Sequence, residues 1–224
     1  MRDLFKQDNT RSEKYSASVA GVSLDYSKNR LTEETLPLLI ALAKDANLES
    51  MRDKMFAGEA INATEQRAVL HTALRNFSGK PVMVDGADVM PEVKATLEKV
   101  KNYVNAVSNG ELVGYTGKAF TDIVSIGIGG SFLGPKIMSE ALKPYQQKQL
   151  KVHFIANVDA CHISDVLGTL NPETTLVITS SKTMTTQETL CNANTAKDWF
   201  LKTAPIEAVA KHFACVSSNI AGAK

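Results

Sequence analysis

The second half of the chain alternates between short apolar runs and segments whose apolar residues recur at helical spacing. This alternation limits the fold more than any other feature of the sequence. From residue 121 onward it predicts strands at 122–126, 151–157, 175–179 and 212–217, and helices at 132–142, 162–169 and 186–202. Strands that alternate with helices build a parallel sheet through right-handed crossovers, with helices on both faces. We therefore expect an α/β fold with a doubly wound parallel sheet.

The first part of the sequence has few β-branched runs and is expected to be mainly helical. Its pattern predicts helices at 32–43, 65–76 and 91–104. Asn62 and Glu65 form the start signal of the second of these helices. Glycines then interrupt the pattern within 110–117. We place a domain boundary there, between a helical segment at 1–115 and a sheet domain at 116–224.

The charge balance excludes whole classes of partner. The 224 residues carry 25 Lys and Arg against 24 Asp and Glu, so no overall field attracts nucleic acid or an anionic membrane. No apolar run approaches the roughly 18 residues that span a bilayer, and we expect a cytoplasmic protein. The three cysteines, Cys161, Cys191 and Cys215, are widely spaced and odd in number, as is typical of reduced thiols. No residues stand at metal-ligand spacing, so we expect no metal site.

A glycine-rich turn follows the first strand of the predicted sheet. The apolar run that ends at Ile126 leads into three glycines within 127–130, and a helix is expected after them. Glycine lets the backbone approach a ligand closely. Helix amino termini leave N–H groups unpaired and carry about half a unit of positive charge. This combination suits a bound phosphate.

A hydroxyl-rich loop follows the third strand in the same way. Four hydroxyls and one lysine lie within six positions of this loop, more than one helix cap needs. If the two strands are neighbours, both loops open on one edge of the sheet and hold one phosphate together. Two helix termini and one lysine sum to about +2, against about −1.5 to −2 for a phosphate monoester. The predicted phosphate-binding residues are Gly130, Ser131, Ser181, Lys182, Thr183, Met184, Thr185 and Thr186.

Other interpretations of these loops stay open or fit less well. A dinucleotide-binding motif needs glycine at position 132, where Phe132 stands, which opposes an NAD-type oxidoreductase. A nucleotide-triphosphate loop needs lysine after its last glycine, where Pro135 stands. An ordinary tight turn remains an alternative for 127–130, and helix capping remains one for the hydroxyls. Lys182 could also be a solvated surface lysine.

The two loops carry a family resemblance. Five segments are similar to bacterial members of the glucose-6-phosphate isomerase family, the first two of them to its phosphate-loop motifs: 127–134, 181–189, 24–31, 62–71 and 171–175. The resemblance covers essentially the whole chain and points to the N-terminal part of such an enzyme. It implies that 116–224 is a sugar-phosphate-binding domain of the sugar-isomerase (SIS) type, incomplete at its C-terminus.

The resemblance also implies an activity. Family members interconvert glucose 6-phosphate and fructose 6-phosphate in glycolysis and gluconeogenesis without a metal or an organic cofactor, and the full-length enzymes are homodimers. Their catalytic glutamate, histidine, lysine and arginine come from the part beyond Lys224. This chain is therefore expected to supply the residues that bind the substrate phosphate. It is expected to contain no main catalytic residue and to be inactive alone. Glu188 would orient the ring-opening histidine of the full enzyme.

Three positions depart from the family pattern. Met184 stands where phenylalanine is usual, and methionine fills similar space more flexibly without changing the donors of the loop. Ala160 and Cys161 stand where glycine and threonine are usual. A non-catalytic sugar-phosphate sensor built on the same domain remains an alternative. Such a regulator needs a partner or DNA-binding domain, and residues 1–115 offer no basic recognition helix.

Overall fold

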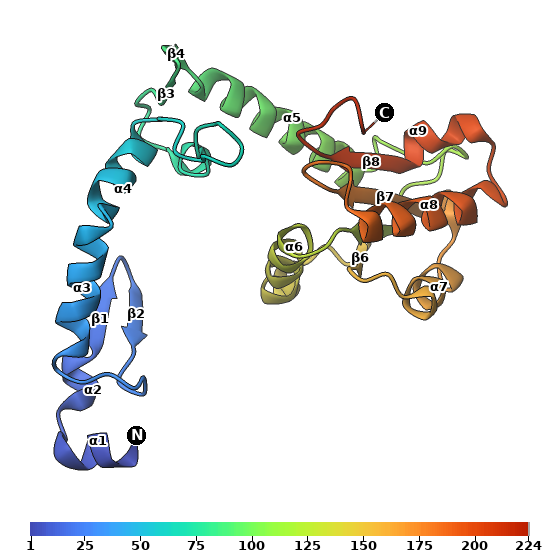
Figure 1. Ribbon diagram of the computed structural model, residues 1–224. Coiled ribbons are helices and arrows are strands. Elements are labelled where there is room, and N and C mark those ends of the chain that lie inside the picture. Colours follow the sequence, from blue (N-terminus) through green and yellow to red (C-terminus); the bar gives the residue numbers. More distant parts are fainter. Residues whose placement is uncertain (224) are drawn as a thin grey trace. The chain divides into compact units, whose positions relative to one another are not determined.

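The computed structural model describes residues 1–223. The chain forms two compact units, Met1–Thr96 and Leu97–Lys224, and Figure 1 labels most of their helices and strands. The division between the units falls inside the long helix α5 (Met90–Ser108). Among the described helices, none combines the length and the apolar character needed to cross a membrane.

The first unit consists of short helices and two small antiparallel hairpins. Before α5 its elements are α1 (Arg2–Gln7), α2 (Arg11–Lys14), β1 (Ser16–Val19), β2 (Val22–Asp25), α3 (Thr35–Asp45), α4 (Leu48–Phe56), η1 (Ala73–Arg75), β3 (Met83–Val84) and β4 (Ala87–Asp88). The helix predicted at 32–43 is found as α3, and the one predicted at 91–104 is found within α5. Both predictions are confirmed because these segments have a clear helical period.

The expectation of a mainly helical first part missed the hairpins. In the first of them, Val19 pairs with Val22, and the two residues between them form the turn. Ala20 and Gly21 have φ values of +50° and +79°, and a two-residue hairpin turn of this kind needs positive φ at both central positions. Alanine is not a residue that usually signals such a turn, so the sequence pattern gave no warning of it.

The helix predicted at 65–76 is wrong. Asn62 and Arg67 instead exchange both of their backbone hydrogen bonds, with N···O distances of 3.1 and 3.4 Å, and only a short 3-10 turn forms at 73–75. The Asn62 side chain accepts a hydrogen bond from the Glu65 N–H, as a helix cap would. Gln66 then adopts a φ of +51°, which turns the chain back on itself. Local side-chain bonds of this kind compete with helix formation, so a start signal did not produce a helix.

The second unit is an α/β sheet domain. Its elements after α5 are β5 (Asp122–Ile126), α6 (Gly130–Ala141), η2 (Lys143–Tyr145), β6 (Lys151–Ile155), α7 (Ala160–Gly168), η3 (Pro172–Thr174), β7 (Thr175–Ser180), α8 (Gln187–Leu201), η4 (Ile206–Ala208), α9 (Val209–His212) and β8 (Phe213–Val216). The four strands pair in parallel in the order β6-β5-β7-β8. The predicted strands and helices of this half are therefore confirmed, with ends that differ by a few residues.

Successive apolar residues along each strand point to opposite faces of the sheet, so both faces are apolar. One face packs against α7 and α8 and contains a buried cluster of Val124, Ile126, Ile155, Ile163, Leu167, Val177 and Ala196. The other face contains Leu176, which packs with Val107 of α5 and with Phe120. On this second face the ring of Phe132 in α6 contacts that of Phe154 in β6, with centroids 6.1 Å apart. Helices thus cover both faces, which confirms the doubly wound parallel sheet.

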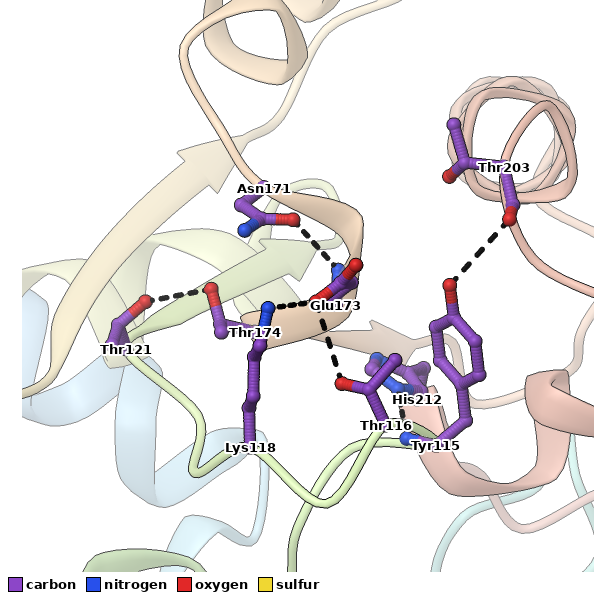
Figure 2. A network of polar contacts seen from close by, with 9 residues as sticks. All are labelled: Tyr115, Thr116, Lys118, Thr121, Asn171, Glu173, Thr174, Thr203 and His212. Carbon is purple, nitrogen blue, oxygen red and sulfur yellow. Dashed lines mark hydrogen bonds and ion pairs between the residues drawn. The ribbon is translucent and has the colours of Figure 1, made fainter.

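Polar contacts join the loops at the amino edge of the sheet (Figure 2). The Thr121 hydroxyl, just before β5, donates to the hydroxyl of Thr174, just before β7, at 3.0 Å. The Asn171 side chain accepts from the Glu173 N–H at 3.0 Å. Lys118 forms an ion pair with the Glu173 carboxylate and lowers the pKa of that group. These contacts align the starts of the two central strands.

His212 is the buried centre of this edge. Its Nε2 accepts a hydrogen bond from the Tyr115 N–H at 2.9 Å, so its proton lies on Nδ1, which donates to the Thr175 carbonyl at 2.8 Å. The imidazole is fully buried and lies against three aromatic rings, those of Tyr115, Phe120 and Phe200. A neutral histidine therefore joins the loop before β5 to the start of β7.

Candidate functional site

The carboxyl edge of the sheet brings the two predicted phosphate loops together. β5 and β7 are direct neighbours, with Ile126 opposite Thr179 at their carboxyl ends. The chain leaves both strands at the same level, into 127–130 on one side and 181–186 on the other. The expectation that these loops follow neighbouring strands is confirmed. In open α/β sheets, ligands bind in the crevice outside the carboxyl ends of such strands.

Glycine is required in the first loop for steric reasons. Gly127 is buried, and a Cβ atom there would lie 2.9 Å from both the Cβ and the carbonyl oxygen of Ser131. Gly129 has a φ of +58°, which residues with a side chain rarely adopt. Helix α6 begins at Gly130, and no side-chain hydrogen bond among the described residues caps its amino terminus. The N–H groups of Ser131 and Phe132 donate to the Ile128 and Gly129 carbonyls, each at 3.1 Å. What this edge offers to an anion is therefore the positive end of the α6 dipole, which no side chain of the described residues caps.

The second loop is arranged around the buried hydroxyl of Ser181. This oxygen accepts a hydrogen bond from the Met184 N–H at 3.1 Å and lies 3.4 Å from the hydroxyl of Thr186. Met184 has a φ of +53°, a left-handed conformation that is uncommon for a residue other than glycine. The loop thus folds back on itself between the end of β7 and the start of α8.

Two exposed hydroxyls and a helix terminus complete this loop. The hydroxyls of Thr183 and Thr185 lie 2.7 Å apart. Thr186 is the residue before α8, yet within the described chain its side chain makes no capping hydrogen bond to the helix. Lys182 is exposed, and Glu188 is half-buried in the first turn of α8. Predicted residues of the second loop therefore lie together at the amino terminus of α8.

The neighbouring helix α7 differs from α6 and α8. Its preceding residue, Asp159, accepts hydrogen bonds from the N–H groups of Cys161 and His162 at 2.9 and 3.4 Å. A carboxylate therefore already satisfies the positive end of α7. Of the three helices that begin at this edge, α6 and α8 are the two without a side-chain cap in the described part of the chain. An anion is accordingly favoured between the β5 and β7 loops and disfavoured at α7.

One part of the site was missed from the sequence. Residues 217–219 follow β8, and their side chains donate hydrogen bonds to the Lys182 and Thr183 carbonyls of the 181–186 loop. Two serines and an asparagine at the end of the strand predicted at 212–217 resemble the hydroxyl cluster after β7, and this signal could have identified them. The same strand carries Cys215, whose thiol has a raised pKa because it is partly buried.

The fold and the carboxyl edge define an open α/β protein with a candidate anion site between two helix amino termini. Residues 25–224 match the family model described as phosphoglucose isomerase, and the chain belongs to that family. It is 60% identical over all 224 residues to a glucose-6-phosphate isomerase of Pseudoalteromonas atlantica and 57% identical to one of Shewanella baltica.

A solved structure supports the same assignment. The chain is similar to the crystal structure of a glucose-6-phosphate isomerase from Chlamydia trachomatis, with a TM-score of 0.73 and 28% identity. That similarity covers 95% of this chain and 40% of the other. The chain likewise spans 41% of the length of its relatives from Pseudoalteromonas and Shewanella. Nearly the whole of this chain therefore aligns with about two fifths of the length of each of these proteins.

Proposed function

We propose that this chain is the part of a glucose-6-phosphate isomerase that binds the phosphate group of the substrate. The observation that carries the proposal is the pair of neighbouring helix amino termini, α6 and α8, that have no side-chain cap in the described chain. The relatives, which are named glucose-6-phosphate isomerases, support the choice of a sugar phosphate as the anion. The whole enzyme would interconvert glucose 6-phosphate and fructose 6-phosphate.

The charge of the site matches that of the ligand. Each helix amino terminus contributes about +0.5 and Lys182 contributes one full charge, for a total near +2. A phosphate monoester carries about −1.5 to −2 near neutral pH. The Gly130 N–H and the Ser131 hydroxyl at the start of α6, together with the hydroxyls of Thr183 and Thr185, would donate hydrogen bonds to its oxygens. Ser181 and Met184 would act through the shape of the loop, since the Ser181 hydroxyl already accepts the Met184 N–H.

The phosphate is remote from the carbon atoms that react. Binding energy realised at a remote group can position the rest of a substrate for proton transfer. Isomerisation also needs an acid and a base to open the sugar ring and a base to move the proton. We assign these groups to the remainder of the enzyme and expect this chain alone to be inactive. Glu188, at the start of α8, would orient the ring-opening histidine.

The proposal extends to the organisation of the protein. Residues 116–224 would form the SIS-type domain, and the second half of α5 would belong with it, because the compact unit begins at Leu97 and Val107 packs with Phe120 and Leu176. The complete enzyme would be a cytoplasmic homodimer without a role in nucleic-acid or membrane binding. It would require no metal and no organic cofactor.

Calorimetric titration of the 224-residue chain at low salt would test the proposal. Fructose 6-phosphate should bind and unphosphorylated fructose should not. Lys182→Ala should weaken binding of the phosphorylated sugar roughly ten- to a hundredfold, as expected for a charge-assisted hydrogen bond. Lys151→Ala is a matched control, because Lys151 is an exposed lysine at the opposite end of the strands.

Each outcome of this titration has a definite meaning. Equal binding of the two sugars would refute a phosphate site. Phosphate-dependent binding that Lys182→Ala leaves unchanged would remove the lysine from the site but keep the helix termini in it. Turnover by the chain alone would show that it contains a catalytic base, contrary to the proposal.

A further inference from the structure

The carbonyl of Lys182 accepts an unusual number of hydrogen bonds. The hydroxyl groups of Ser217 and Ser218 donate to it at 3.1 and 2.8 Å, and the Ser218 N–H donates at 3.3 Å. The backbone bond continues the ladder between β7 and β8, in which the Ser181 N–H donates to the Val216 carbonyl at 3.0 Å. The two hydroxyl groups are additional to that ladder.

The next carbonyl of the loop is held from the same side. The Asn219 side-chain amide donates to the Thr183 carbonyl at 2.9 Å, and its oxygen accepts from the Gly222 N–H at 2.9 Å. The Ser217 hydroxyl also accepts from the Asn219 N–H at 3.0 Å. The segment 217–219 is therefore ordered by bonds of its own and makes side-chain bonds to two consecutive carbonyls of the loop.

These bonds determine which way the loop presents its backbone. In a trans peptide unit, the C=O of one residue and the N–H of the next point in opposite directions. Because the Lys182 carbonyl points to 217–219, the Thr183 N–H points away from that segment. A carbonyl oxygen turned toward an anion would repel it, whereas an N–H group attracts it. Holding the Lys182 carbonyl back leaves the Thr183 N–H for the ligand, whereas the Met184 N–H donates to the Ser181 hydroxyl.

We propose that Ser217, Ser218 and Asn219 are positioning residues for the phosphate loop. They hold the Lys182 and Thr183 carbonyls away from the ligand and keep the loop in its binding conformation before the ligand arrives. This inference rests on the proposed function and adds residues that lie outside both loop motifs. A loop that is already ordered loses less conformational freedom on binding, so these residues should increase the affinity for the phosphate group.

The test uses a double variant of the 224-residue chain, Ser217→Ala with Ser218→Ala. Binding of fructose 6-phosphate should weaken roughly three- to tenfold, as expected for the loss of two partly exposed hydrogen bonds. The thermal unfolding midpoint should stay close to that of the unchanged chain. Amide exchange at 183–186 should become faster without ligand. Replacing both serines by threonine keeps the hydroxyl groups and should restore affinity and protection.

A matched control separates the loop from a general effect of removing serine. Ser16 is also an exposed serine whose hydroxyl donates to a backbone carbonyl, that of Ser12 at 2.6 Å. Ser16→Ala should leave phosphate binding unchanged.

The outcomes distinguish the two proposals. If the unchanged chain fails to bind fructose 6-phosphate, the proposed function fails, and the positioning role falls with it. If it binds and the double variant binds equally well, only the positioning role is refuted. Weaker binding that comes with a lowered unfolding midpoint and is not restored by threonine would also refute it, because the serines would then serve general stability.

Discussion

Acid should destabilise the α/β unit through His212. The imidazole is fully buried, and its Nε2 accepts the Tyr115 N–H, an arrangement that only the neutral ring can make. Burial lowers the pKa of His212 below its usual value of 6.5; the Thr175 carbonyl opposes this shift, and the charge of Lys211 adds to it. In the unfolded chain the same histidine regains its ordinary pKa. Below that value the unfolded state binds a proton that the folded state does not.

The sign and the size of the effect follow from this difference. Where the unfolded state binds more protons, the free energy of unfolding falls as the pH falls. For a histidine that stays neutral in the fold, the loss between about pH 7.5 and about pH 5.5 reaches at most about 1.4 kcal/mol. The contribution is fully present above the unfolded pKa, and its loss stops once the folded histidine is itself protonated.

Urea unfolding followed by tryptophan fluorescence would measure how the free energy of unfolding depends on pH. The chain has one tryptophan, Trp199 in α8, which packs against the cores of the α/β unit. His212→Gln removes the titrating ring, and should cost about 1–3 kcal/mol at neutral pH because the buried Thr175 carbonyl loses its donor. The free energy of unfolding of this variant should depend less on pH than that of the unchanged chain. His162→Gln, at an exposed position of the same unit, is the control.

The two proteins must be compared by how steeply the free energy of unfolding changes with pH, because other groups also titrate in this range. Parallel pH dependences for the unchanged chain and for His212→Gln would refute the argument. So would an NMR titration in which the His212 ring protonates at its ordinary pKa within the folded chain. Either result would mean that the folded chain accommodates the charged ring at little cost, even though Nε2 can then no longer accept the Tyr115 N–H.

Two further predictions concern local geometry. Gly114→Ala should destabilise the α/β unit by about 1–3 kcal/mol in urea unfolding. The new Cβ would lie 2.4 Å from the Glu173 carbonyl oxygen and 2.8 Å from the His212 ring. An unchanged unfolding midpoint would show that this edge of the sheet can relax. Asp159→Ala should cost about 1 kcal/mol by removing the cap of α7, with Asp159→Asn retaining most of the stability; equal losses in the two variants would contradict a capping role.

The positions of the two candidate phosphate loops were predicted from the sequence because their signals are local. A strand that ends in glycines, or in hydroxyls and a lysine, before a helix can be recognised within about 15 residues of sequence, and both loops are found at the predicted places. The failed helix at 65–76 shows the limit of such signals. Asn62 makes the expected bond to the Glu65 N–H, but the pairing with Arg67 was the stronger local choice.

The sequence by itself determined the parallel α/β sheet, since strand and helix periods reflect which side of each segment is buried. It also located the two loops and excluded a complete dinucleotide motif. Only the tertiary structure decided that β5 lies between β6 and β7, that His212 is buried beneath Tyr115, and that residues 217–219 hold the loop after β7. The contacts of His212 with Tyr115 and of residues 217–219 with that loop join positions 35 to 97 residues apart. Residues so distant along the chain meet only after the sheet has formed, and no local periodicity records which partners they meet.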